Sequence, residues 1–188
     1  MSLGFRMHAE RTPNPHTVKW VLGQDVVPSG LGVATVAFEE TPDPAVSPLA
    51  ARVRGVEGVV SVLLGPQFVS VSKDPAREWT DLAPPIVAAI KAWAAEEEPA
   101  LGEAWEAPEQ ADEGEIVARI REVIEKDVQP YVAMDGGEIV FAGYRDGTVE
   151  VYLRGACAGC PSSTITLKTG IEARLKEEIP EVQAVVAV

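Results

Sequence analysis

The chain has 188 residues, of which 46% are apolar and 24% are charged, a composition typical of a globular protein with one or two domains and not of a disordered chain. Its formal net charge of −13 argues against nucleic acid or an anionic membrane as a partner, because both attract basic surfaces. The longest uncharged run, residues 58–72, is broken by Gly65-Pro66 and is too short to cross a bilayer. The first residues show no signal-peptide pattern, so we expect a cytoplasmic protein.

The first half of the chain predicts a small domain of mixed strands and helices. In chain order we expect strands over residues 5–10, 17–22 and 32–38, a short helix opened by Ser47-Pro48, a hairpin of strands 59–64 and 67–72, and a helix over 78–95 whose regular part starts at Pro84-Pro85. Thr12-Pro13-Asn14-Pro15 is a turn signal between the first two strands. The block has no cysteine and no glycine-rich phosphate loop, which favours a binding or scaffold domain over an enzyme.

The acidic charge is concentrated between the two halves of the chain. Residues 96–114 carry 8 acidic side chains and no basic one, together with Pro99 and Pro108. Self-repelling charge and proline are typical of a tether, so we expect a solvated linker between a domain over residues 1–95 and a domain over residues 115–188. A helical extension or an acidic recognition segment is the less favoured interpretation, and Trp105 is a candidate to dock on a domain surface.

The second half predicts the element order helix, strand, strand, helix, strand. The helix spans residues 115–128 and is ended or bent by Pro130, and a turn follows at Asp135-Gly136-Gly137. Strands over 138–142 and 148–153 are joined by the hairpin turn Arg145-Asp146-Gly147. A helix starting at Pro161 and ending before Pro180, then a strand over 182–188, complete the chain. The predicted class is therefore α+β, with two small mixed domains.

The candidate functional residues are Cys157 and Cys160, the two cysteines of the chain, in a C-x-x-C spacing. In a reducing cytosol such a pair indicates a metal or redox site and not a structural disulfide. The pair lies in a glycine-flanked loop directly before a predicted helix. Unpaired N–H groups and the helix dipole lower a thiol pKa at that position and favour the thiolate, the form that binds metal or attacks a disulfide.

Three chemistries are compatible with this pair. A dithiol redox site needs the two thiols alone, whereas a zinc ion or an iron–sulfur cluster commonly takes four protein ligands. The second half of the chain has no histidine, so both metal sites require a second chain and a symmetric dimer. Thioredoxin-like motifs follow a strand of a parallel βαβ unit, and here the two preceding strands form an antiparallel hairpin, which favours a metal or cluster site.

Residues 135–188 resemble the C-terminal domain of the NifU/Nfu family of iron–sulfur cluster scaffold and carrier proteins. The matching residues are Asp135-Gly136-Gly137, Gly155, Cys157, Cys160, Pro161, Ser162, Ser163 and Ile179-Pro180-Glu181-Val182. The first half resembles the Nfu N-terminal domain through Thr12-Pro13-Asn14-Pro15, Ser47-Pro48-Leu49-Ala50, Val56-Glu57-Gly58-Val59 and Gly65-Pro66. Ala156 and Ala158 occupy positions that vary in the family.

The resemblance implies a carrier and not an enzyme. It implies that Cys157 and Cys160 of two subunits hold one [4Fe–4S] cluster in a homodimer, which receives the cluster from upstream assembly proteins and passes it to apo-proteins. It also associates the N-terminal domain with partner recognition. A dithiol–disulfide oxidoreductase that uses the same two cysteines is the alternative function.

Overall fold

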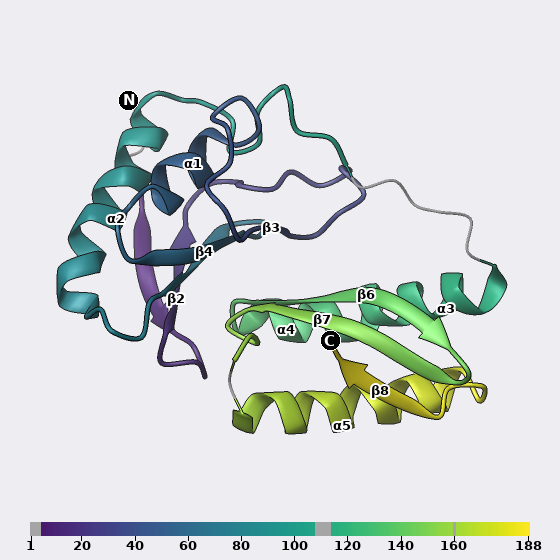
Figure 1. Cartoon of the computed structure of the whole chain (residues 1–188). Coiled ribbons are helices and arrows are strands. Elements are labelled where there is room, and N and C mark those ends of the chain that lie inside the picture. The colour runs from purple at the N-terminus through teal and green to yellow at the C-terminus, as the bar shows by residue number, and fades with distance from the viewer. Residues whose placement is uncertain (1–4, 108–113, 160) are drawn as a thin grey trace.

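The computed structural model describes residues 5–107, 114–159 and 161–188, with the backbone alone described for residues 161–164. The described chain forms two sheets, each with its own apolar core, and the mixture of helices and strands confirms the α+β class. Figure 1 shows the first sheet in the purple-to-teal half of the chain and the second in the green-to-yellow half. No helix in the described ranges is both long and apolar enough to cross a membrane.

The first sheet has five antiparallel strands in the order β1-β2-β5-β4-β3. Their bounds are β1 Met7–Arg11, β2 Thr17–Leu22, β3 Val36–Phe38, β4 Val59–Leu64 and β5 Phe68–Lys73. The predicted β4–β5 hairpin is confirmed, and β3 is shorter than the predicted strand. Helices α1 (Pro48–Arg54) and α2 (Trp79–Ala95) cover one face of this sheet.

Local sequence signals account for α1 but not for the start of α2. Ser47 caps α1 as predicted, because its hydroxyl accepts a hydrogen bond from the Ala50 N–H. The prediction that regular helix starts at Pro84-Pro85 is wrong, since α2 already begins at Trp79. Both prolines lie on the exposed side of α2, where water can satisfy the freed carbonyl groups, and Leu82 before them is buried in the core.

The start of the acidic segment packs on the first domain. Arg52 forms ion pairs with Glu96 and Glu98, and the buried Ser47 hydroxyl donates to the Ala100 carbonyl oxygen at 2.6 Å. Ala100 itself belongs to the apolar core of this domain. Residues 96–100 are therefore held against α1 and α2, unlike the solvated linker expected, whereas residues 108–113 lie outside the described residues. The domain boundaries themselves stay a prediction.

The second sheet has three strands in the order β6-β7-β8, namely β6 Gly137–Arg145, β7 Thr148–Gly155 and β8 Ala184–Ala187. The predicted β6–β7 hairpin is confirmed, and Asp146 and Gly147 at its turn both have positive φ, as a tight two-residue turn requires. β8 pairs with β7 in parallel, which makes β7, α5 (Pro161–Glu178) and β8 a βαβ unit. The sequence argument against dithiol chemistry is therefore wrong, because the cysteine motif does follow a strand of a parallel crossover.

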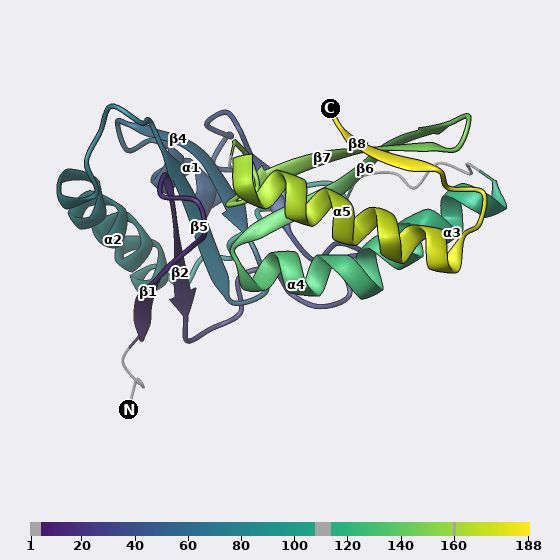
Figure 2. The same ribbon diagram turned by 90° about the horizontal axis from the view of Figure 1, so that it is seen from below.

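The helix that precedes β6 does not end at Pro130. It runs as α3 (Glu115–Val123), a π-helical turn η1 (Ile124–Val128) and α4 (Gln129–Met134). The wider π turn ends at Val128, two residues before Pro130, and accommodates the residue that lacks an N–H donor. Figure 2 shows α3, α4 and α5 side by side on one face of the second sheet. The apolar side chains of these helices and of the sheet form the second core.

An ion pair and a hydrogen bond fix α5 to the rest of its domain. Arg174 pairs with Asp127 at 2.8 Å, and a Glu172 carboxylate oxygen accepts a hydrogen bond from the Val185 N–H of β8 at 3.1 Å. The pKa of Glu172 is lowered, first by its hydrogen bond from Lys176 and then by the bond from Val185. These contacts set the direction of α5 and thereby the place of its N-terminal end.

Gly170 offers a simple test of the helical assignment of α5. It lies inside the helix, it is exposed, and a Cβ added there would meet no atom within 4 Å. Alanine loses less backbone entropy than glycine on forming a helix, so we expect Gly170→Ala to raise the free energy of unfolding by about 0.5–1 kcal/mol. Urea denaturation followed by circular dichroism measures this change. A destabilised variant would contradict the helical environment of residue 170.

Candidate metal centre

The candidate site is the loop that joins β7 to α5, packed against the turn that joins α4 to β6. The Ala156 N–H donates to the Gly136 carbonyl oxygen at 3.1 Å, and the Ala158 N–H closes the loop on Gly155 at 3.1 Å. Gly155 has a φ of +61°, and a Cβ there would come within 2.6 Å of the Gly136 carbonyl oxygen. Glycine is therefore required at Gly155 both for its backbone conformation and for the close approach of the two segments.

Cys157 points into its own domain. Its side chain is 3% exposed and packs in the second core. A Cβ added at Gly137 would lie 2.2 Å from its Sγ atom, so the missing side chain of Gly137 makes the space for the sulfur. In the described part of the loop, only Ala158 and Gly159 are exposed. The packing of Cys157 explains why a second glycine follows Gly136.

Cys160 lies outside the described residues. The helix start that the sequence predicts is confirmed, because α5 begins at Pro161, directly after the loop. Among the described residues, which omit Cys160, no group of three or more His, Cys, Asp and Glu side chains lies close enough to hold a metal ion. A metal or cluster at this loop thus has Cys157 as its one described candidate ligand, and a thiolate ligand suits iron or zinc.

An ion pair between Glu138 and Arg154 lies beside the loop. Glu138, next to Gly137, is buried and has Arg154 as its ion-pair partner, with Oε2 and Nη1 3.6 Å apart. The other carboxylate oxygen of Glu138 accepts a hydrogen bond from the Thr35 hydroxyl of the first domain. The positive charge of Arg154 is therefore paired with the buried carboxylate of Glu138 and is not available in full to the cysteine loop.

Sequence reasoning missed one residue that contacts the loop. The Nδ2 group of Asn14 donates to the carbonyl oxygen of Ala158, between the two cysteines in sequence, at 2.8 Å. Asn14 belongs to the Thr12-Pro13-Asn14-Pro15 segment, which the sequence indicated only as a turn. The signal was present as a recurring family segment, but its partner lies 144 residues away and no local pattern links the two.

The chain matches two family models that together cover most of its length. Residues 7–97 match the model described as scaffold protein Nfu/NifU N terminal, and residues 120–186 match the NifU-like domain. A NifU-like protein of Schizosaccharomyces pombe is 36% identical over 189 residues, which cover 97% of this chain and 72% of that protein. The human protein named NFU1 iron-sulfur cluster scaffold homolog, mitochondrial, is 38% identical over 185 residues, covering 95% of this chain and 70% of that protein.

Solved structures show a partial likeness. The solution structure of a NifU-like protein from Saccharomyces cerevisiae has 20% identity and a TM-score of 0.46, and the likeness covers 53% of this chain and 86% of that chain. The identity and coverage of the human and fission-yeast relatives carry the assignment, together with the two matched domains in their order along the chain. The chain therefore belongs to the Nfu/NifU family.

Proposed function

We propose that this protein is an iron–sulfur cluster scaffold and carrier that binds its cargo through Cys157 and Cys160. The observation that carries the proposal is the C-x-x-C loop of a NifU-like domain, placed at the N-terminal end of α5, in a chain 38% identical to a protein named as an iron-sulfur cluster scaffold. Helix N–H groups at this position stabilise thiolates, and thiolates are the ligands that iron–sulfur clusters take.

The cargo is a [4Fe–4S] cluster held between two copies of the chain. One chain supplies two cysteines, and a [4Fe–4S] cluster commonly takes four thiolates. Two loops that meet across a two-fold axis supply four. Because Cys157 is turned into its domain, loading requires the loop to rearrange so that the sulfur reaches the cluster.

The protein acts as a carrier and not as an enzyme. It takes the cluster from upstream assembly proteins and delivers it to apo iron–sulfur proteins. A site made by two chains opens when the subunits separate, whereas a site closed within one chain would need local unfolding to release its cargo. A cytoplasmic location stays a prediction, and the human relative is by its name mitochondrial.

Anaerobic reconstitution tests the proposed function. The purified apo-protein is incubated with ferrous iron, sulfide and a thiol reductant, and iron and sulfide are then counted per chain. We expect about two iron and two sulfide per chain, with absorption and Mössbauer spectra of a [4Fe–4S] cluster. Zinc binding without any iron–sulfur chromophore would contradict the proposal.

Cluster and dimer should appear together. Sizing chromatography with absorbance detection is expected to show the chromophore at the mass of a dimer, because a single chain holds half of the ligands. Removal of the cluster with a chelator is expected to dissociate the dimer into monomers. A monomer that carries a full [4Fe–4S] cluster would contradict the shared site.

Transfer to a recipient separates the carrier from the dithiol oxidoreductase. Loaded protein is mixed with an apo-enzyme that requires a [4Fe–4S] cluster, in the presence of an iron chelator, and recipient activity is followed over time. We expect activity to return faster than with the same amounts of free iron and sulfide. Failure with every recipient, together with brisk disulfide reduction by the apo-protein, would establish the oxidoreductase instead.

A further inference from the structure

The first sheet has a second face that helices do not cover. α1 and α2 pack on one face. Because side chains alternate along a strand, Leu63, Phe68 and Ser70, which are absent from the helix-side core, belong to the other face. Nevertheless Leu63 and Ser70 are each only 1% exposed. Something other than the helices of their own domain therefore buries this second face.

The end of the second domain that carries the cysteine loop covers this second face of the first sheet. A Cβ at Gly155 would lie 2.9 Å from the Leu63 side chain, and a Cβ at Gly136 would lie 2.5 Å from the Ser70 hydroxyl. Strand β7 contacts both β4 and β5. Figure 2 shows this end of the second domain next to β4 and β5. The two glycines beside the cysteine loop thus allow the first domain to approach closely as well.

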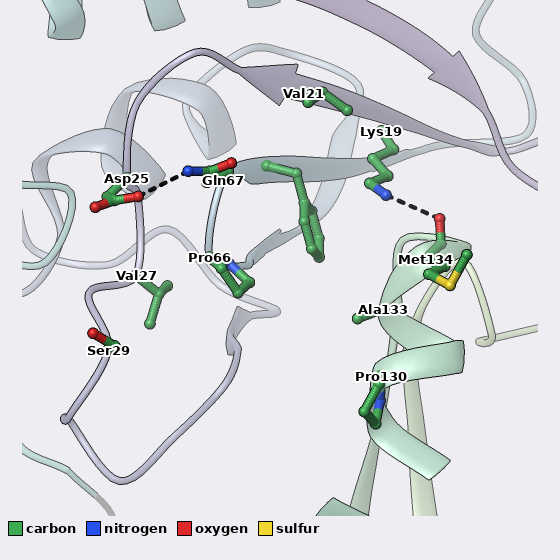
Figure 3. A pocket seen from close by; sticks show the side chains of 11 residues that line it. Lys19, Val21, Asp25, Val27, Ser29, Pro66, Gln67, Pro130, Ala133 and Met134 are labelled. Atoms are coloured by element: carbon green, nitrogen blue, oxygen red, sulfur yellow. Dashed lines mark hydrogen bonds between the residues drawn. The ribbon is translucent and has the colours of Figure 1, made fainter. Parts of the chain in front are cut away.

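Hydrogen bonds join the two domains along the same strip. Asn14 donates to Ala158 at 2.8 Å, and Lys19 donates from Nζ to the Met134 carbonyl oxygen at 2.9 Å, as Figure 3 shows for the second pair. Both acceptors are backbone carbonyl groups of segments that flank the candidate site. The first domain therefore holds the loop and the end of α4 at once.

The turn that carries Asn14 is preorganised for this contact. The Thr12 hydroxyl donates to the carbonyl oxygens of Asn14 and Thr17, both at 2.9 Å. The His16 N–H donates to Asn14 Oδ1 at 2.9 Å, which fixes the amide orientation and directs Nδ2 toward Ala158. Asn14 is 6% exposed. The turn therefore connects two strands and also positions the Asn14 side-chain amide to donate to the cysteine loop.

Two cavities flank this central strip, and the buried hydrogen bond from Thr35 to Glu138 also joins the two domains. A cavity of about 510 Å³ lies on one side of the strip, between Pro66-Gln67 and α4, as Figure 3 shows. A second cavity of about 760 Å³ lies between residues 30–37 and the second sheet. Polar side chains such as Ser70 and Lys19 lie on the covered face. Domain contacts that are polar and incompletely packed separate more readily than a continuous apolar core.

We propose that the second face of the first sheet is a docking surface for the apo cysteine loop, and that it competes with a second copy of the chain for that loop. This rests on the proposed function, in which the loops of two copies meet at the cluster. Asn14 contacts the loop at Ala158, and the proposed function requires a partner copy to reach the same loop. In the closed state, which is that of the apo-protein, the cysteine loop lies against the first sheet. Cluster loading and dimerisation require the first domain to move away from the loop, which gives the open state.

Two variants weaken the closed state from different points of the interface. Asn14→Asp keeps the acceptor for the His16 N–H but places a carboxylate oxygen against the Ala158 carbonyl oxygen. Leu63→Lys adds a charge on the covered face, outside the helix-side core. Gln24→Glu and Val60→Lys are the matched controls, because they make the same chemical changes at exposed positions of the same domain.

Small-angle X-ray scattering measures how extended the full-length apo-proteins are, and hydrogen exchange measures how well the amides of the cysteine loop are protected. Neither measurement needs a cluster. We expect the wild type and both controls to fit the closed structure, with slow exchange in the loop around Ala156. Asn14→Asp and Leu63→Lys are expected to be more extended, with about tenfold more of the open form. Cluster loading and dimer formation at limiting iron should then proceed about three- to tenfold faster in both variants than in their controls.

The outcomes are separable. If the apo wild type is as extended in solution as both variants, the proposed contact between the two domains is wrong. Opened variants that load and dimerise no faster than their controls would overturn the competition. If no protein takes up a cluster while the apo wild type is closed and the variants open, the proposed function fails and the competition with it, but docking of the loop on the first sheet stands.

Discussion

Cys157→Ser and Cys160→Ser proteins will each retain no stable iron–sulfur cluster after anaerobic reconstitution. Each substitution removes two of the four thiolates of a dimeric site, and a hydroxyl is a poor ligand for cluster iron. Iron and sulfide contents are expected to fall from about two of each per chain to near zero, with the loss of the visible chromophore. Iron and sulfide analysis after removal of excess reagents measures this.

Cys157→Ser will in addition weaken the fold. Cys157 is packed in the second core, so a serine hydroxyl there loses its contact with water, at a cost of about 1–3 kcal/mol in the free energy of unfolding. Ala158→Ser is the matched control, since it adds a hydroxyl to an exposed position of the same loop. A full cluster in either cysteine variant would contradict the ligand assignment. Unchanged stability of Cys157→Ser would contradict the buried position of the sulfur.

Gly137→Ala will disturb the candidate site without replacing a ligand. The new methyl group would lie 2.2 Å from Cys157 Sγ and 3.2 Å from a Val132 methyl carbon, far closer than packed atoms can approach. Gly137 does not have positive φ, so the clash and not the backbone conformation causes the effect. We expect a loss of about 1–3 kcal/mol in the free energy of unfolding of the apo-protein. The displaced sulfur should also lower the yield of reconstituted cluster.

Gly143→Ala is the control for this substitution. It lies in the same strand, and its new methyl group would meet only the end of the Glu150 side chain, at 3.2 Å, which can move away. Thermal and urea denaturation of the two variants, beside their cluster contents, separate a specific clash from a general effect of alanine in β6. Equal stability and equal cluster yield for both variants would show that Cys157 does not occupy the space beside Gly137.

Local sequence patterns determined most of the secondary structure of this chain. The bounds predicted for β2 and β4 are confirmed to the residue, because alternating or β-branched apolar runs bounded by turn residues leave little choice. Ser47-Pro48 starts α1 and Asp146-Gly147 makes the β6–β7 turn for equally local reasons, a side-chain cap and backbone freedom. Cys157 and Cys160 stood out because C-x-x-C is itself a local spacing.

Only the tertiary structure decided how those elements are used. α2 begins before Pro84 because burial of Leu82 in the core outweighs the hydrogen bonds that two prolines remove. Cys157 is buried because Gly137, twenty positions earlier, leaves space for its sulfur, and β8 is parallel to β7 because α5 must return along the sheet. Asn14 reaches Ala158 across 144 residues. Contacts between distant residues depend on the summed packing of both domains, and no periodicity within a short window encodes them.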